Sequence, residues 1–218
     1  MQSHFEAEFG KLKKTIQDMA ILVDKQVDDT LKALLELDPG LCKVVKARDD
    51  EIDRFDNLIQ EQSENLLALF QPVALDLRYI IAAMMINTQL ERCGDITVNI
   101  AQRTMKVIKN KELLLDSEIP EMARAASQMM HDAIEAFTTG NIDLARTVFD
   151  KDDIVDDFNK KTFKYLVRKM KKNKDQVEPC SHLLVLSRQL ERLGDHATNI
   201  AEDVIFIVEA QIVTHQNK

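Results

Sequence analysis

The chain has 218 residues, a net charge of −8, and 45% hydrophobic and 30% charged residues. This length suits one or two domains and buries enough surface to fold without a disulfide or a metal. The acidic balance argues against nucleic acid as the main partner, because phosphate binding needs a basic surface. With five Gly and four Pro, the chain has few breakers, which favours long helices over many short strands.

Cysteine usage and the N-terminal pattern predict where the protein works. Cys42, Cys93 and Cys180 are odd in number and unrelated in spacing, so we expect reduced thiols in a reducing compartment. The first residues lack the basic and apolar regions of a signal peptide, and no stretch approaches the ~18 consecutive apolar residues of a membrane span. We therefore expect a cytoplasmic protein.

Three long helices are predicted in the first half. Apolar residues recur every three or four positions over residues 5–34, until Asp38-Pro39-Gly40 ends the helix. A second helix is expected over 41–70, followed by the breaker Gln71-Pro72. A third, over 73–109, is apolar on more than one face, which is typical of a central and deeply buried helix. The expected seam of the second helix comprises Val45, Ile52, Phe55, Ile59, Leu66 and Leu69.

The same order of elements returns in the second half. Residues 110–120 are expected to form a linker, and helices are predicted over 120–138, 142–172 and 179–212. Their breakers fall where those of the first half fall. The sequence therefore predicts an all-α fold of two tandem three-helix bundles, packed antiparallel like coiled coils, with units 1–110 and 111–218.

One stretch of the sequence occurs twice. Residues 89–102 read QLERCGDITVNIAQ, residues 189–202 read QLERLGDHATNIAE, and nine of the fourteen positions agree at an offset of 100. A duplicate at nearly half the chain length indicates a tandem repeat. Each copy carries two carboxylates four residues apart, Glu91 with Asp95 and Glu191 with Asp195. The helical phase places the first pair along a packing seam with Met84.

A second acidic element is also repeated. Residues 48–55 (RDDEIDRF) align with residues 151–158 (KDDIVDDF) at an offset of 103. Within them, Asp49 and Asp53 are carboxylates four apart on the second helix, and Asp152 and Asp156 repeat them on the fifth. Each half thus carries two acidic pairs on helices that are adjacent in the predicted bundle.

These acidic pairs need compensation if they face one another. A like-charge pair four apart on a helix costs ~0.2–0.5 kcal/mol, and carboxylates about 4 Å apart across helices repel by ~4 kcal/mol at an effective dielectric of 20. Arg92 and Arg192 are each one residue from a Glu and point to a different face. A hard cation bound by oxygen ligands compensates more directly. The alternative is a solvated helix face laced with salt bridges.

Gly94 and Gly194 recur at one position of the repeat. A glycine inside a helix costs about 1 kcal/mol relative to alanine. Its retention in both copies indicates close approach of a neighbouring backbone or of a ligand, with helix packing alone as the other explanation. His196 follows Asp195, but the first copy has Ile96 there, which argues against a ligand role for this histidine.

These motifs resemble those of a known family. Glu-Arg-x-Gly-Asp followed by Asn-Ile-Ala, Asp-Asp-Glu-Ile-Asp at 49–53 and Pro-Val-Ala-Leu-Asp-Leu-Arg at 72–78 are similar to the signatures of PhoU, the accessory and regulatory family of bacterial phosphate-specific transport. The resemblance covers essentially the whole chain, both repeats, in the expected order. The family fold, two three-helix bundles in tandem, agrees with the fold predicted above.

The resemblance implies a metal-binding regulator. Similar proteins bind clusters of iron, zinc, manganese or magnesium through these acidic motifs. The matching positions here are Asp49, Asp53, Glu91, Asp95, Asp152, Asp156, Glu191 and Asp195. The implied role is a cytoplasmic negative regulator that connects the ATPase subunit of the phosphate ABC transporter to a membrane sensor histidine kinase. Through these partners it would sit peripherally at the inner membrane, and we also expect a homodimer.

Two features set the halves apart. The second half has no counterpart of Asp76-Leu77-Arg78. The fifth helix ends in a basic run over residues 160–174, which is either a solvated helix end or a dock for an acidic partner or an anionic membrane leaflet.

We expect no enzymatic activity, because no nucleophile–base pair, phosphate-binding Gly loop or Zn-type Cys/His spacing is present. A ferritin-like di-metal carboxylate oxidase or store is one alternative, although it would need Glu-x-x-His motifs that the sequence lacks. A metal-free coiled-coil adaptor is another.

Overall fold

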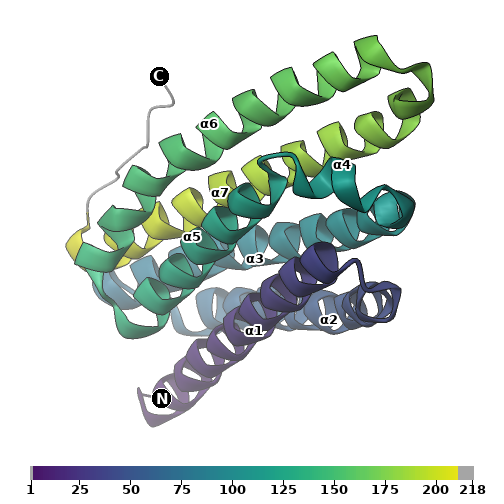
Figure 1. The fold of residues 1–218 in the computed structure, drawn as a ribbon. Helices are drawn as coiled ribbons and strands as arrows, with labels where there is room; N and C mark the ends of the chain where they lie inside the picture. Colours follow the sequence, from purple (N-terminus) through teal and green to yellow (C-terminus); the bar gives the residue numbers. More distant parts are fainter. Residues whose placement is uncertain (1, 211–218) are drawn as a thin grey trace.

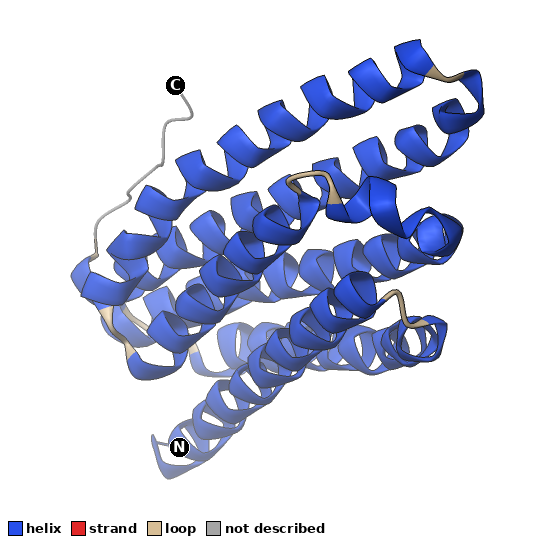
Figure 2. Ribbon diagram, in the orientation of Figure 1, coloured by secondary structure: helices blue, strands red, loops and turns tan. Residues whose placement is uncertain are grey.

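The computed structural model describes residues 2–210, and all of its regular structure within that range is helical (Figures 1 and 2). The six long helices are α1 (Gln2–Glu36), α2 (Pro39–Phe70), α3 (Ala74–Val107), α5 (Ile119–Thr139), α6 (Ile142–Lys172) and α7 (Val177–Glu209). Three short helices complete the order: η1 (Ile108–Asn110), α4 (Lys111–Leu115) and η2 (Lys174–Gln176).

The helix ends are set by local chemistry. The Asp38 carboxylate accepts hydrogen bonds from the backbone N–H of Gly40 and Leu41, at 2.7 and 3.2 Å, and so caps the start of α2. Gly140 ends α5 in the left-handed conformation, with φ of 68°, where a glycine carries no Cβ penalty. The Asn141 side chain then caps α6 by accepting from the N–H of Leu144.

The helices form two three-helix bundles in tandem, which confirms the predicted fold class. In the first bundle α1, α2 and α3 all pack on one another, and in the second α5, α6 and α7 do the same. The bundles meet mainly where α3 packs against α7, with α1 against α5 beside them. One continuous apolar core runs through both halves, so the repeats share an interior and are not separate globules. The unit boundary at residue 110 stays a prediction.

Three local expectations are wrong. The predicted linker contains helix α4, because Leu113 and Leu114 are buried and hold that segment against the bundle. The last helix begins at Val177, two residues before the predicted start, and its predicted end at Ile212 lies outside the described residues. Leu69 is 70% exposed, because at this turn Leu66, Leu67 and Phe70 face the core and Leu69 lies on the other side of α2.

Between residues 2 and 210, no helix combines the length and the apolar character that crossing a membrane requires.

Candidate functional site

The predicted acidic residues lie where two neighbouring helices face each other in each bundle. Asp49 and Asp53 are on α2 and face α3, which carries Glu91 and Asp95. The two helices approach closely at Gly94. A Cβ placed on Gly94 would lie 3.0 Å from Cδ1 of Ile52 and 3.3 Å from a carboxylate oxygen of Asp49. The glycine therefore lets α2 approach α3 and brings Asp49 onto the opposing backbone, as its repetition suggested.

In the first cluster, burial and neighbouring carboxylates together disfavour the ionised form of Asp49 and Glu91. Burial, followed by the charges of Asp53, Asp95 and Asp50, raises the pKa of Asp49 to about 6. Burial also raises the pKa of Glu91, with further contributions from Asp95, Asp56 and Asp53 that the nearby Arg92 opposes. These contributions cross between α2 and α3, so the carboxylates of the two helices lie within electrostatic range of one another.

The second cluster has the same layout but contains its own cation. Burial raises the pKa of Glu191, and the neighbouring carboxylates Asp195, Asp156 and Asp152 add to it. Arg188 opposes that shift through a short ion pair with Glu191. Arg188 also lies close enough to Asp195 to counter the effect of burial on its pKa.

Two further positions join these clusters that the motifs did not single out. In the first half, the amide nitrogen of Asn87 donates to the Asp56 carboxylate at 2.6 Å, and Asp56 faces Glu91. In the second half, Ser187 donates to the amide oxygen of Asn159 at 2.7 Å. These pairs are related by the same offsets, 103 and 100, as the acidic motifs. Extending the repeat alignment past residue 55 and before residue 89 pairs these positions, but the residue types differ between the halves, so identity alone would not have marked them.

The acidic side chains differ in exposure. Asp152 is buried, Asp49 and Glu91 are half-buried, and Asp95 is exposed. The expectation that Asp95 shares the packing seam of Glu91 is therefore wrong. Four helical residues turn about 40° more than one full circle, which carries Asp95 to the solvent edge of the seam.

An ion pair between the first two helices of each repeat holds the cluster-bearing helix in place. Arg48, next to Asp49, pairs with Asp29 on α1 at 2.7 Å. The corresponding Lys151, next to Asp152, forms a short ion pair with Asp132 on α5. The amide of Gln128 donates to the same Asp132 at 2.8 Å. Both pairs join positions related by the offset of 103.

Polar groups also bridge the two repeats at their central contact. Nδ1 of His196 on α7 lies 2.7 Å from Oε1 of Gln89 on α3, and Asn199 donates to the same oxygen at 3.3 Å. Burial lowers the pKa of His196 to about 4, so the ring is neutral at physiological pH. This histidine serves the contact with the other repeat.

The donor chemistry of the acidic clusters fits a hard cation, because carboxylate oxygens that repel one another favour Mg, Mn or Fe. Their side chains do not converge as they stand. Among residues 2–210, no three His, Cys, Asp or Glu side chains gather closely enough to hold an ion. Metal binding by Asp49, Asp53, Glu91 and Asp95, or by their counterparts, therefore requires side chains to rotate toward one another.

Comparisons with known proteins agree with the repeat and the fold. The PhoU domain family model matches residues 16–104 and 119–204. The chain is 32% identical to the phosphate-specific transport system accessory protein PhoU homolog 1 of Thermotoga maritima, covering 94% of this chain and 88% of that protein. It is 33% identical to the PhoU homolog of Pseudomonas aeruginosa, covering 99% and 89%.

Solved structures agree as well. The crystal structure of PhoU from Pseudomonas aeruginosa superposes with a TM-score of 0.88 at 32% identity, over 95% of this chain and 100% of that chain. The phosphate transport system regulatory protein PhoU from Streptococcus pneumoniae, 24% identical, shares the fold with a TM-score of 0.81 over 96% of this chain and 99% of its own. The chain therefore belongs to the PhoU family.

Proposed function

We propose that the protein is an accessory regulator of phosphate transport. The observation that carries this proposal is the match over nearly the whole chain to phosphate-specific transport system accessory proteins, in both repeats and in the same order. A partial match to one bundle would have supported only the fold.

The finer role we propose is negative regulation. At high phosphate, the protein acts on the cytoplasmic side of the inner membrane, as a homodimer, and connects the ATPase subunit of the phosphate ABC transporter to a sensor histidine kinase. In this way it keeps the phosphate-starvation response off. The support is the presence of the Glu-Arg-x-Gly-Asp motif in both repeats, at residues 91–95 and 191–195, as in the family that the sequence resembles.

The direct test is a deletion strain that carries a phosphate-repressed reporter. We expect the reporter to be active at high phosphate without the gene and to be silenced again when the intact gene is restored. A reporter that stays repressed in the deletion strain would reject negative regulation. Recovery of the ATPase subunit and the kinase with tagged protein tests the partners separately, and repeated failure to recover either would count against them.

We further propose that the two acidic clusters bind metal ions: iron, zinc, manganese or magnesium. The support is the partial burial of carboxylates on facing helices together with their mutual repulsion, both of which a bound cation would offset. The ion would supply positive charge that fixes the two helices relative to each other. Replacing Glu91 and Asp95 with Ala should lower the metal content of the purified protein, measured by elemental analysis, and an unchanged metal-to-protein ratio would reject their role.

A metal-free adaptor is the second candidate. It is favoured by the finding that no three potential ligands converge within residues 2–210, and by Arg188, which already supplies a cation to the second cluster. Elemental analysis separates the candidates. If the protein purified without chelator contains no metal and still silences the reporter, regulation proceeds through protein contacts alone.

A further inference from the structure

The strongest unexplained feature outside the acidic clusters is the charge at the end of α6. Residues 160–174 contain eight of the 29 Lys and Arg residues of the chain and no Asp or Glu. This run carries a charge of +8 in a protein of net charge −8, so the other residues together carry −16. The molecule is therefore strongly polarised, with its positive charge concentrated on the end of one helical hairpin.

Most of these cations lack a partner. Lys160, Lys161 and Lys169 lie 3.5 to 3.9 Å from single carboxylates in surface pairs, which contribute little. In the part of the chain that the structure describes, the other five form no ion pair: Lys164, Arg168, Lys171, Lys172 and Lys174. All five are exposed. Local ion pairing therefore does not account for the run.

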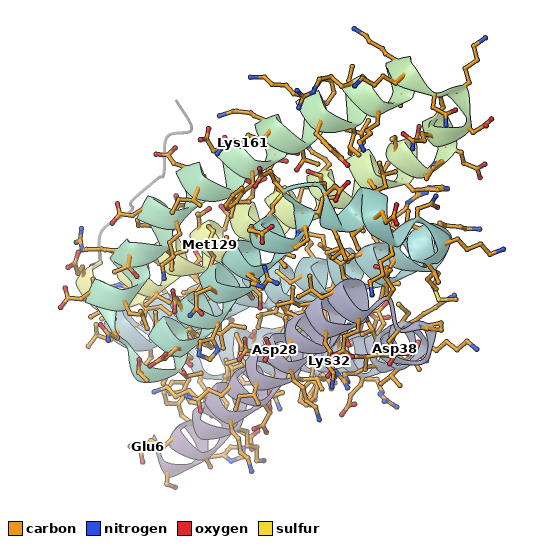
Figure 3. The ribbon with its side chains drawn as sticks, viewed as in Figure 1. Glu6, Asp28, Lys32, Asp38, Met129 and Lys161 are labelled. Carbon is orange, nitrogen blue, oxygen red and sulfur yellow. The ribbon has the colours of Figure 1, made fainter. Side chains whose placement is uncertain are left out.

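An aromatic side chain lies among these cations. Phe163 is 57% exposed although it could bury a large apolar surface. It lines an open hollow of about 410 Å³ together with Lys164, Val167 and Arg168. The buried residues Thr162 and Leu166 hold the opposite face of α6 against the core, so the basic and apolar side chains point outward. Figure 3 labels Lys161 on this outer side of α6 and shows nitrogen-tipped side chains projecting from the end of the helix.

We propose that the outer face of the last turns of α6, with η2, docks on an anionic phospholipid surface. Lysine and arginine on flexible stems attract anionic headgroups without needing a fixed geometry, while an exposed aromatic ring enters the interface between them. A surface with these two features, and without preformed ion-pair geometry, fits a lipid headgroup layer better than a folded acidic protein.

The charge distribution also fixes the orientation. The rest of the chain carries −16 in sum and is repelled by an anionic leaflet, so the α6–α7 end is the part that turns toward it. This end lies at the edge of the molecule, away from the N-terminus of α1 (Figure 1). The second acidic cluster lies nearer the middle of α6 and α7, and the first lies on α2 and α3, so docking at this end is centred away from both. The inference does not depend on the proposed function.

The first test is binding to sedimented vesicles. Vesicles of roughly one-quarter phosphatidylglycerol in phosphatidylcholine should bind the intact protein at low salt, and vesicles of phosphatidylcholine alone should not. The double variant Lys164→Glu with Arg168→Glu should weaken binding by about tenfold or more. The matched control, Lys14→Glu with Lys25→Glu, makes the same change of charge at exposed positions of α1 and should bind as the parent does. Circular dichroism establishes that both variants are folded.

The second test reports on Phe163 directly. The chain contains no Trp, so Phe163→Trp introduces a single indole whose emission reports its surroundings. Adding phosphatidylglycerol vesicles should shift that emission to the blue and protect it from a water-soluble quencher. The control Ile21→Trp, at a position on α1 that is 61% exposed, should show no shift.

Three results would overturn the proposal. The intact protein fails to bind phosphatidylglycerol vesicles, or both double variants lose binding equally, or the indole at position 163 remains as exposed to quencher with vesicles as without them. An acidic protein partner predicts a different outcome. In that case polyglutamate would bind to the basic run, be blocked by the Lys164→Glu and Arg168→Glu changes, and vesicles would have no effect.

Discussion

The two halves of the molecule share a backbone plan but hold their acidic clusters in different ways. In the first half, Asp49 and Glu91 face other carboxylates, with Arg92 as a weak opposing charge. In the second half, Arg188 pairs with Glu191, where the first half has Thr88. Asn159 also replaces Asp56 at the corresponding position. The second cluster thus has one fewer carboxylate and one more arginine.

The comparison separates the structural features that both repeats share from those that only one repeat has. The ion pair to the first helix of each repeat recurs in both halves, so it belongs to the fold of the repeat. The approach of the neighbouring helix is tight at Gly94 and ordinary at Gly194. The neutralising arginine occurs in one half only. We infer that charge compensation in the first cluster comes from outside the chain, whereas the second cluster is compensated in part from within.

The largest expected effect compares the two helix-positioning ion pairs. Lys151→Met should destabilise the fold by about 2 kcal/mol, because Asp132 is only 7% exposed and would be left as a buried charge without its cation. Arg48→Met should cost about 1 kcal/mol, because Asp29 is 26% exposed and water can replace the arginine. Urea denaturation of both variants measures the difference, and equal losses would contradict the account.

The second expected effect is pH-dependent. The pKa of Asp49 is about 6 in the folded state and 3.8 as the reference for the unfolded chain, so the folded state binds the proton more tightly. Stability associated with this group is therefore lost as the pH rises from about 4 to about 6. Asp49→Asn should stabilise the metal-free protein by about 1–2 kcal/mol at pH 8, after allowance for partial exposure.

At pH 3.5 the charge-dependent gain of the same Asp49→Asn variant should fall to a few tenths of a kcal/mol (~0.2), because the carboxyl is then mostly protonated in both states. Thermal or urea unfolding in the presence of a chelator at the two pH values provides the measurement. A stabilisation that is independent of pH would show that burial of the group, and not its charge, sets the effect.

The third prediction compares the two repeated glycines. At Gly94 a new Cβ meets Ile52 at 3.0 Å in the buried core, so Gly94→Ala should destabilise by about 1 kcal/mol despite the gain in helix propensity. At Gly194 the nearest atoms, on Met129, are 3.5 Å away, which is ordinary contact. Gly194→Ala should therefore stabilise by about 0.5–1 kcal/mol. Unfolding midpoints that move in the same direction would refute this contrast.

The smallest expected effect comes from exchanging Arg188 and its counterpart Thr88 between the two halves. Arg188→Thr should raise the pKa of Glu191 further, and Thr88→Arg should lower the pKa of Glu91, because a nearby cation favours the ionised carboxyl. The change in stability should stay below about 1 kcal/mol, since Arg188 is largely exposed. Carbon-detected NMR titration of the two carboxyls follows each pKa, and shifts of the opposite sign would contradict the proposed neutralising role.

Periodicity alone predicted most of the fold. Residues 5–34 and 41–70 repeat apolar side chains every three or four positions. A pattern of this length predicts a helix reliably even where the exact first and last residues are not predicted. The boundaries depended on contacts that no local pattern encodes. Helix α4 forms because Leu113 and Leu114 are buried against the bundle. Leu69 is exposed because Phe70, and not Leu69, faces the core at the end of α2.

The candidate site was predictable as far as the repeat reached. The repeated motifs singled out Glu91, Glu191 and the aspartates on the neighbouring helices. The predicted packing of those helices then indicated that the carboxylates face one another. The same reasoning missed Asp56 and Arg188, because each differs in type from its counterpart in the other half. Asp56 reaches Glu91 only through the packing of α2 on α3, which no local pattern encodes. Arg188 lies three residues before Glu191 on the same helix, a spacing that the sequence itself offers for an ion pair.

The most direct test of this account is calorimetric titration of Mn²⁺ into the metal-free protein. The account predicts two classes of site, with the tighter one abolished by Glu91→Gln with Asp95→Asn and retained in Glu191→Gln with Asp195→Asn. Two sites of equal affinity, or a tight site that is lost only with the second-half pair, would contradict the claim that the first cluster relies on an external cation and the second on Arg188.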